Sequence, residues 1–174
     1  IQITAEATPR YLYRNISINR IRETVPNAKF IILLRDPVLR LFSNFNHNYK
    51  WVPKFKDKYS SFEMYWNRVH DSDYYLIEKG LYYYTLIKWF EHFKREQFCI
   101  IKSEDLFENT QKIYSKVIDF LGVHPYELQN VGVYRNNEYE KKLDMEMKTI
   151  IQSFYSAYNK KLRELLGDEF NWNY

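Results

Sequence analysis

The sequence predicts a protein of the α/β class, in which helices flank a parallel sheet. Two apolar runs, at residues 30–34 and 98–102, have the length and β-branched content of strands buried on both faces of such a sheet. Runs this short also fit buried helix segments. Helical patterns alternate with these runs, which is typical of parallel α/β folds. The length of 174 residues suits one hydrophobic core, so a single domain is expected over residues 1–174.

The N-terminal residues are expected to form the end of a strand, a turn and a helix. Residues 1–4 have the apolar content of a strand end, and Glu6 lies in the turn that follows. Residues 10–23 have helical spacing. The inward face of this helix is predicted to consist of Leu12, Ile16 and either Ile18 or Ile21. Glu6 is a candidate neighbour of an active site, but a solvated turn carboxylate or a helix cap explains it equally well.

The segment that organises the chain follows the first apolar run. Asp36 and Pro37 form a helix start, with a carboxylate at the N-cap and proline at the first helical position. The residues after them have one apolar stripe at helical spacing, consisting of Val38, Leu41, Phe42, Phe45 and Tyr49. Arg40, Ser43 and His47 lie together on another face. The segment therefore predicts a strand, a tight turn and a helix.

Arg35 and Ser43 are candidate ligands for an anion in this segment. Arg35 stands at the carboxyl end of the strand, where open α/β sheets bind ligands, and Ser43 lies two turns into the helix. The N–H groups and the positive dipole at the start of the helix favour an anion. A guanidinium binds phosphate through two hydrogen bonds, and a hydroxyl adds one donor. The structural alternative pairs Arg35 with Asp36 and packs Ser43 on a helix face.

Residues 51–73 are the least regular part of the sequence, and such stretches often form lids or binding loops. They combine aromatic side chains with Lys54, Lys56 and Lys58, a mixture that suits an acceptor ring or sugar. Four of the apolar residues have helical spacing, namely Phe62, Tyr65, Trp66 and Val69. Packing of the aromatic residues on the core is therefore expected ahead of ligand contact.

The rest of the chain predicts more helices and a loop. Helices are expected over residues 82–94 and 144–166, with a loop over residues 123–143. A further helix follows the second strand, with Asn109 or Thr110 as its N-cap and Gly122 just after its end. The inward face of the last helix is predicted to consist of Ile150, Ile151, Phe154, Tyr158, Leu162 and Leu165.

Composition restricts the class of protein. The 26 basic and 22 acidic residues give a net charge of +4, which allows an anionic ligand, and no nucleic-acid partner is expected. Cys99 is the only cysteine, so an intrachain disulfide and a multi-thiolate metal site are excluded and a buried, inert thiol is expected. His, Asp and Glu nowhere have the spacing of metal ligands, and no membrane span or signal peptide is found.

Five motifs, in order, resemble one enzyme family. Arg-Asp-Pro-x-x-Arg-x-x-Ser at residues 35–43 looks like the 3′-phosphate-binding segment of sulfotransferases that use 3′-phosphoadenosine 5′-phosphosulfate (PAPS). Ala-Glu-Ala-Thr-Pro-Arg-Tyr-Leu at residues 5–12 is similar to the segment that precedes it in that family. Three further stretches of this sequence resemble later segments of the family, namely Gly80-Leu81-Tyr82, residues 103–122 and residues 159–172. The resemblance covers nearly the whole chain.

The resemblance implies a fold, a donor and three site residues. The fold would be the family's P-loop-like parallel sheet flanked by helices. The donor would be PAPS, which leaves as adenosine 3′,5′-bisphosphate, and no metal would be needed. Arg35 and Ser43 would hold the donor's 3′-phosphate. Arg135 lies where relatives have a basic loop that closes over the donor's phosphates, and a solvated surface arginine is the alternative.

The sequence departs from the family at its N-terminus. Relatives begin with a strand, a glycine-rich loop that contains lysine, and a helix, which together hold the 5′-phosphosulfate. No glycine-rich phosphate loop occurs in this sequence, so the N-terminal strand–loop–helix is expected to be missing from it. The catalytic base, a carboxylate or histidine in the family, is unknown. Glu6 and His47 are candidates, the latter because imidazole titrates near neutral pH.

The function implied by the resemblance is transfer of a sulfuryl group from PAPS to a hydroxyl or amine. The acceptor is unknown and is expected to be a carbohydrate, a lipid or a small metabolite. Two alternatives remain: a non-catalytic module that binds adenosine bisphosphate or nucleic acid, and a nucleotide kinase of similar architecture. The cytoplasm is the expected location, with the Golgi lumen as the alternative if the full-length protein carries an N-terminal anchor.

Overall fold

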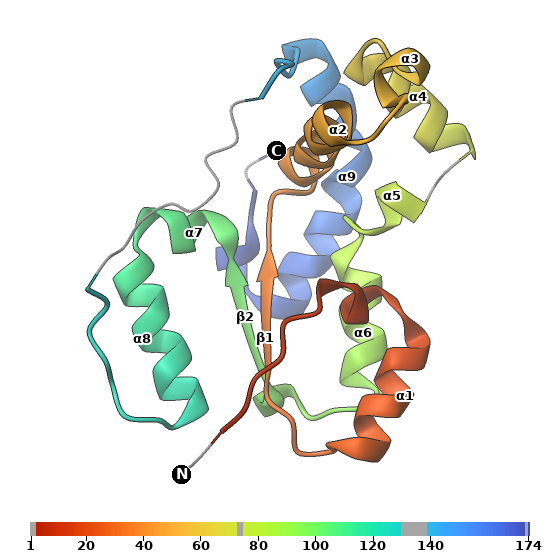
Figure 1. The fold of residues 1–174 in the computed structure, drawn as a ribbon. Coiled ribbons are helices and arrows are strands. Elements are labelled where there is room, and N and C mark those ends of the chain that lie inside the picture. The colour runs from red at the N-terminus through yellow and green to blue at the C-terminus, as the bar shows by residue number, and fades with distance from the viewer. Residues whose placement is uncertain (1–2, 73–74, 130–138, 173) are drawn as a thin grey trace. The chain divides into compact units, whose positions relative to one another are not determined.

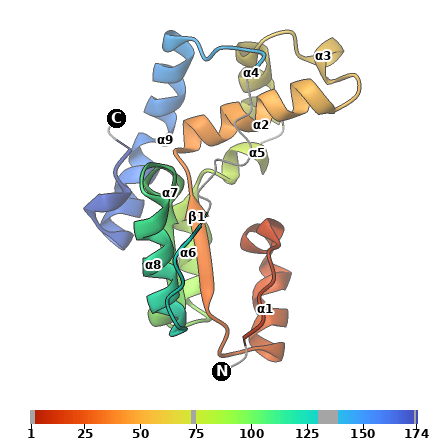
Figure 2. The same ribbon diagram turned by 60° about the vertical axis from the view of Figure 1, so that its left-hand side comes forward.

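The computed structural model describes residues 3–72, 75–129, 139–172 and 174 (Figures 1 and 2). Its strands are β1 (Phe30–Leu34) and β2 (Phe98–Lys102). Its α-helices are α1 (Asn15–Thr24), α2 (Pro37–Trp51), α3 (Phe55–Lys58), α4 (Phe62–Ser72), α5 (Tyr75–Glu78), α6 (Tyr82–Phe90), α7 (Ser103–Glu108), α8 (Thr110–Leu121) and α9 (Met145–Leu166). Short 3-10 helices are η1 (Pro9–Tyr13), η2 (Arg95–Gln97) and η3 (Asp168–Phe170).

The elements group into two compact units. The sheet unit consists of Ile1–Leu34 and Tyr84–Tyr134, and the helical unit consists of Arg35–Tyr83 and Arg135–Tyr174. The chain passes from the sheet unit into the helical unit directly after β1. Whether residues 1–174 act as one domain stays a prediction.

In the sheet unit, β1 and β2 pair in parallel, and their register runs from Phe30 opposite Phe98 to Leu34 opposite Lys102. On one face, the ring of Phe30 stacks on Phe98 and meets the edge of Trp89 from α6, with centroids 4.8 and 5.2 Å away. Helices α6 and α8 lie on either side of the strands (Figure 1). The predicted α/β class with a parallel sheet is confirmed.

The other face of the sheet is covered only beside β2. Cys99 and Ile101 of β2 pack there against Ile113 of α8. The prediction of burial on both faces is therefore correct for β2 but wrong for β1, where Ile31 is 41% and Leu33 is 49% exposed. Alternation along a strand points these two side chains to the face of α8, and α8 packs mainly beside β2.

The N-terminal helix differs from its prediction. Residues 10–23 form η1 and then α1, and between them Arg14 has extended backbone angles. This break changes the phase of the helix, so Ile18 is buried whereas Ile16 is 55% exposed. The described residues 3–8 have no regular structure, so a strand end is not observed at residues 3 and 4.

The caps of α2 and α8 are those that the sequence predicts. Asp36 accepts hydrogen bonds from the backbone N–H groups of Val38 and Leu39, at 2.8 and 3.2 Å. Asn109 accepts from the N–H of Lys112 at 3.0 Å, which selects it over Thr110 as the N-cap of α8. Gly122 follows α8 with a φ of 71°, a left-handed conformation that favours glycine.

The helical unit has its core between α2, α4 and α9. The predicted stripe of α2 is confirmed, with Val38, Leu41, Phe42 and Phe45 buried and Tyr49 partly buried. Helix α2 packs against both α4 and α9 (Figure 2). The core is largely aromatic: Phe45 contacts the rings of Phe55, Phe62 and Tyr65 within 6 Å.

Residues 51–73 are more regular than their composition suggests, because α3 and α4 lie within them. The helical stripe of Phe62, Tyr65, Trp66 and Val69 is buried, as is Phe55. Core packing is therefore confirmed as the role of these aromatic residues. Trp51 differs from them and is 65% exposed.

Helix α9 begins at Met145, after the N-cap Asp144, whose carboxylate accepts from the N–H groups of Glu146 and Met147, and it ends before Gly167. Its inward face includes Ile151 and Leu162 as predicted, but Ile150 is 46% exposed. Tyr155 is buried in addition, and its hydroxyl donates to the carbonyl of Ile77 at 3.0 Å. A Cβ atom on Gly80 would lie 2.8 Å from the Tyr155 ring, so only glycine allows this close approach.

Candidate functional site

Arg35 and Ser43 meet at one oxygen atom, the hydroxyl of Tyr139. Arg35 Nη2 donates to Tyr139 Oη at 3.3 Å. The Ser43 side chain lies near enough to the same hydroxyl to lower its pKa. The sequence predicts that Arg35 and Ser43 share an anion, and the structure places both side chains near the Tyr139 hydroxyl.

The electrostatics of this hydroxyl favour negative charge. Burial raises the pKa of Tyr139, but the hydrogen bonds from Ser43 and Arg35 and the guanidinium charge outweigh it, so the pKa lies below the ordinary value of a tyrosine. A phenolate is more stable at this position than it is in water. The same environment would stabilise a phosphate oxygen for the same physical reasons.

The backbone and the ring around this oxygen are held in place. The Tyr82 hydroxyl, on a side chain only 3% exposed, donates to the carbonyl oxygen of Arg35 at 2.8 Å. The Tyr139 ring meets the buried ring of Phe42 edge to face, with centroids 5.3 Å apart. These contacts fix the backbone of Arg35 and the plane of Tyr139 within the helical unit.

The start of α2 contributes less to an anion than the sequence suggests. The Asp36 carboxylate already accepts from the N–H groups of Val38 and Leu39. It is buried and lies next to Arg35 in the sequence. An anion here would therefore be bound mainly by the Arg35 and Ser43 side chains rather than by the first N–H groups of the helix.

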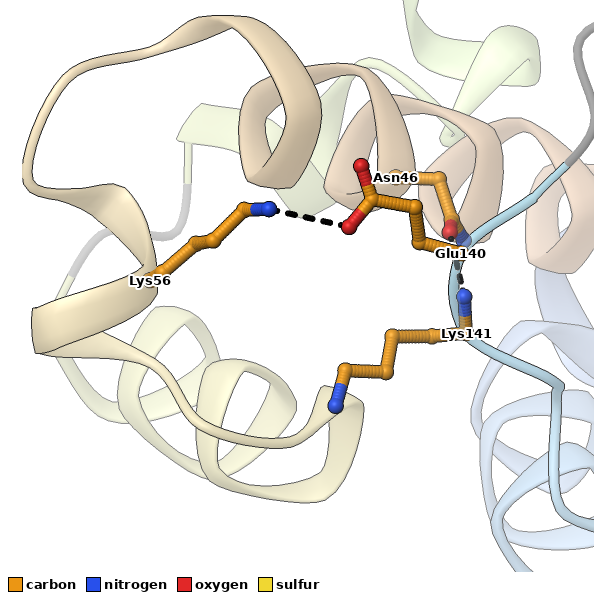
Figure 3. Close-up of polar contacts among 4 residues, drawn as sticks. All are labelled: Asn46, Lys56, Glu140 and Lys141. Atoms are coloured by element: carbon orange, nitrogen blue, oxygen red, sulfur yellow. Dashed lines mark hydrogen bonds and ion pairs between the residues drawn. The ribbon is translucent and has the colours of Figure 1, made fainter.

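The two residues after Tyr139 each make a polar contact with another part of the helical unit (Figure 3). The backbone N–H of Lys141 donates to Oδ1 of the buried Asn46 at 3.1 Å, and Asn46 Nδ2 donates to the carbonyl of Phe42 at 3.2 Å. Glu140 forms an ion pair of 2.9 Å with Lys56. We refer to residues 139–141 as the Tyr139 segment, and it is tied to α2 and α3.

Two lysines lie over the same aromatic ring near this segment. Lys56 Nζ and Lys141 Nζ are 4.8 and 4.9 Å from the centroid of Tyr49 on α2. Lys50 Nζ lies 5.3 Å from the ring of the exposed Trp51. The C-terminal end of α2 therefore combines exposed lysines with aromatic surface.

The remaining predicted site residues are His47, Glu6 and Arg135. His47 lies one turn beyond Ser43 on α2 and is exposed. Glu6 belongs to the sheet unit and accepts from the hydroxyls of Thr8 and Tyr11, at 2.7 and 2.9 Å. The Thr8 bond, followed by the Tyr11 bond, lowers the pKa of Glu6, which weakens it as a base near neutral pH. Arg135 lies outside the described residues.

The roles of Tyr139 and Asn46 were not predicted from the sequence. Tyr139 falls in a predicted loop, 104 residues from Arg35, and no local pattern marks it. Asn46 gave a weak signal, since it is a polar residue beside the apolar stripe of α2 and a buried amide requires partners.

No group of three or more His, Cys, Asp or Glu that could hold a metal ion occurs among residues 3–72, 75–129, 139–172 and 174. Within those same ranges, every helix is too short or too polar to cross a membrane.

Comparisons with known proteins define the class. Residues 3–166 match the family described as "Sulfotransferase domain", and the chain therefore belongs to the sulfotransferase domain family. Mouse carbohydrate sulfotransferase 15 is 28% identical over 176 residues, which cover 84% of this chain and 31% of that protein. Human heparan sulfate glucosamine 3-O-sulfotransferase 3B1 is 25% identical over 198 residues, covering 99% of this chain and 50% of that protein.

The chain thus spans between about a third and a half of these curated relatives. A solved structure, the sulfotransferase from Alicyclobacillus acidocaldarius, superposes with a TM-score of 0.70 over 92% of this chain and 63% of that one. The two sequences are 22% identical, so this comparison shows the fold.

Proposed function

We propose that this chain carries the part of a sulfotransferase that binds the 3′-phosphate of PAPS, and that it acts as one domain in transferring the sulfuryl group to a hydroxyl or amine. Membership of the sulfotransferase domain family supports this function over the nucleotide kinase and the non-catalytic module. The observation that carries the site assignment is that the Arg35 guanidinium and the Ser43 side chain lie near the same hydroxyl oxygen, that of Tyr139.

The chemistry of the two side chains fits a terminal phosphate. Arg35 supplies a fixed positive charge and several N–H donors, and Ser43 supplies one O–H donor. A charge-assisted hydrogen bond to phosphate contributes about 1.5–3 kcal/mol. Loss of Arg35 should therefore weaken donor binding roughly tenfold to hundredfold. Both groups anchor the donor and make or break no bond themselves.

Sulfuryl transfer depends mostly on positioning and on fixed positive charge, because the nucleophile and the leaving group lie in line while charge spreads over the other oxygens. A base must accept the proton of the acceptor. Glu6 and His47 remain the candidates, and Arg135 remains a candidate for holding the donor's phosphates. PAPS would supply the sulfuryl group, and adenosine 3′,5′-bisphosphate would leave.

We propose a saccharide as the acceptor, since the relatives named above are carbohydrate and heparan sulfate sulfotransferases. The exposed ring of Trp51, with Lys50 beside it, and the exposed Lys54 and Lys58 later in the sequence suit an anionic sugar chain. The compartment stays a prediction, with the cytoplasm first and the Golgi lumen as the alternative.

Isothermal calorimetry with adenosine 3′,5′-bisphosphate tests the site. The wild-type chain should bind saturably, Arg35→Ala at least tenfold more weakly, and Ser43→Ala roughly twofold to tenfold more weakly. Arg22→Ala is the matched control, because Arg22 is an exposed arginine of α1, and it should bind as the wild type does. If wild type and Arg35→Ala bound the nucleotide with equal affinity, the assignment of the 3′-phosphate site to Arg35 would be wrong.

Turnover is tested separately, with PAPS labelled in the sulfuryl group and with neutral or acidic oligosaccharides as acceptors. Label in the saccharide supports the enzyme. Nucleotide binding by the full-length protein without transfer to any acceptor supports the non-catalytic module instead.

A further inference from the structure

Tyr139 occupies the position that a shared phosphate oxygen would need. Arg35 Nη2 donates to Tyr139 Oη at 3.3 Å, and the Ser43 side chain lies near the same hydroxyl. A ligand oxygen that accepts from Arg35 and Ser43 in these side-chain conformations would lie close to the phenol oxygen. This inference rests on the proposed function, since it concerns the same two residues.

The contact with Tyr139 is built into the helical unit. The Tyr139 ring packs on Phe42, and the next two residues are held by the Glu140–Lys56 ion pair and by the hydrogen bond from Lys141 N to Asn46 Oδ1 (Figure 3). Asn46 is 5% exposed, so this attachment has a buried anchor. Three successive residues are thus fixed, and the phenol oxygen is held at the two donors.

The phenol is a weak acceptor that a phosphate can displace. It is neutral when protonated, its residue is 39% exposed, and its bond from Arg35 is long at 3.3 Å. Charge-assisted hydrogen bonds to a phosphate are shorter and about twice as strong as those between neutral groups. Exchange of the phenol for a dianionic phosphate is therefore favourable for Arg35 and for Ser43.

We propose that Tyr139 is a displaceable occupant of the 3′-phosphate site. Its hydroxyl holds the Arg35 and Ser43 side chains together in the absence of donor and leaves that position when the 3′-phosphate binds. The hydroxyl therefore competes with the donor and lowers its apparent affinity.

The variant Tyr139→Phe tests this proposal, because it removes the hydroxyl and keeps the ring on Phe42. A neutral hydrogen bond contributes about 0.5–1.5 kcal/mol net, so Tyr139→Phe should bind adenosine 3′,5′-bisphosphate about twofold to tenfold more tightly than wild type. Tyr126→Phe is the control, since Tyr126 is 62% exposed in the sheet unit, and its affinity should not change. Unchanged affinity of Tyr139→Phe overturns the proposal, and so does weaker binding, which would make the hydroxyl a phosphate donor.

Arg35→Ala separates this proposal from the proposed function. If Arg35→Ala binds the nucleotide weakly and Tyr139→Phe binds it as wild type does, the proposed 3′-phosphate site stands and only the displacement of Tyr139 is wrong. Equal binding by wild type and Arg35→Ala, or no binding by wild type, overturns both.

A measurement without nucleotide tests the contact itself. The absorbance of tyrosinate near 295 nm, recorded against pH for wild type minus Tyr139→Phe, isolates the titration of Tyr139. Ser43→Ala and Arg35→Ala, each compared with its own Tyr139→Phe double variant, should move that titration to higher pH. A titration that neither change moves means that the contact is absent in solution, and the proposal is then wrong.

Discussion

Arg35 and Tyr139 are 104 residues apart in the sequence, and a hydrogen bond of 3.3 Å joins the guanidinium Nη2 to the phenol oxygen. This contact joins the residue directly after β1 to the residue before Glu140, which forms an ion pair with Lys56. With Ser43 it defines a small polar centre beside the aromatic core of the helical unit.

Asn46→Ala should destabilise the protein by about 1–2 kcal/mol, because it removes the buried partner of the Lys141 N–H and leaves that group without its acceptor. Urea unfolding followed by circular dichroism measures the change. Asn48→Ala, at a half-buried position of the same helix, is the control and should cost about 0.5 kcal/mol at most. Equal effects of the two variants would show that Asn46 does not anchor the Tyr139 segment.

Gly80→Ala should destabilise the protein by about 1–3 kcal/mol, since the added methyl group would lie 2.8 Å from the ring of the buried Tyr155. The same urea experiment measures it. In the double variant Gly80→Ala/Tyr155→Ala, the cost should be clearly less than the sum of the two single changes, because the clash is gone. Strict additivity would contradict this explanation of the glycine.

The stability of the protein should depend on pH through Tyr139. Ser43 and Arg35 hold its folded pKa below the ordinary tyrosine value despite burial, whereas the unfolded chain titrates at that ordinary value. Between the two values the folded chain has lost the proton and the unfolded chain still binds it, so stability rises with pH.

The free energy of unfolding of wild type, minus that of Tyr139→Phe, should therefore increase as the pH rises from the folded pKa of Tyr139 to about 10. It should be flat at lower pH, where Tyr139 is protonated in both states. Added salt should reduce the slope, because Tyr139 is partly exposed. A difference that falls with rising pH would contradict the assigned contacts.

Cys99 should react slowly with iodoacetamide in the folded protein. Its side chain is 5% exposed and burial raises the pKa of the thiol, although Lys116 and Arg95 oppose this shift. The double variant Cys99→Ser/Ile31→Cys places a thiol directly opposite on β1, at a position that is 41% exposed. That thiol should react at least roughly tenfold faster. Equal rates would show that β2 is not covered by α8 in solution.

Local signals predicted most of the elements. The Asp36 cap, the apolar stripe of α2 and the burial of β2 each follow from residues close in sequence, and the structure confirms them. Burial on both faces of β1 was wrong because it depends on where a distant helix packs, and α8 lies over the neighbouring strand. The break at Arg14 depends on a single residue with extended angles, which helical spacing does not reveal.

The candidate site was predictable only in part. Arg35 and Ser43 lie on one strand–turn–helix segment, so their proximity follows from short-range geometry. Their shared partner comes from a stretch without helical or strand periodicity and is fixed by tertiary contacts to Asn46, Lys56 and Phe42. No sequence pattern encodes such contacts, so Tyr139 was found only in the structure.

We propose above that Arg35 binds the 3′-phosphate of the donor. The affinities of wild type and Arg35→Ala should be measured for adenosine 3′,5′-bisphosphate and for adenosine 5′-monophosphate, which lacks the 3′-phosphate. Wild type should prefer the bisphosphate at least roughly tenfold, and this preference should nearly vanish in Arg35→Ala. An equal preference in the two proteins would mean that Arg35 does not hold the 3′-phosphate.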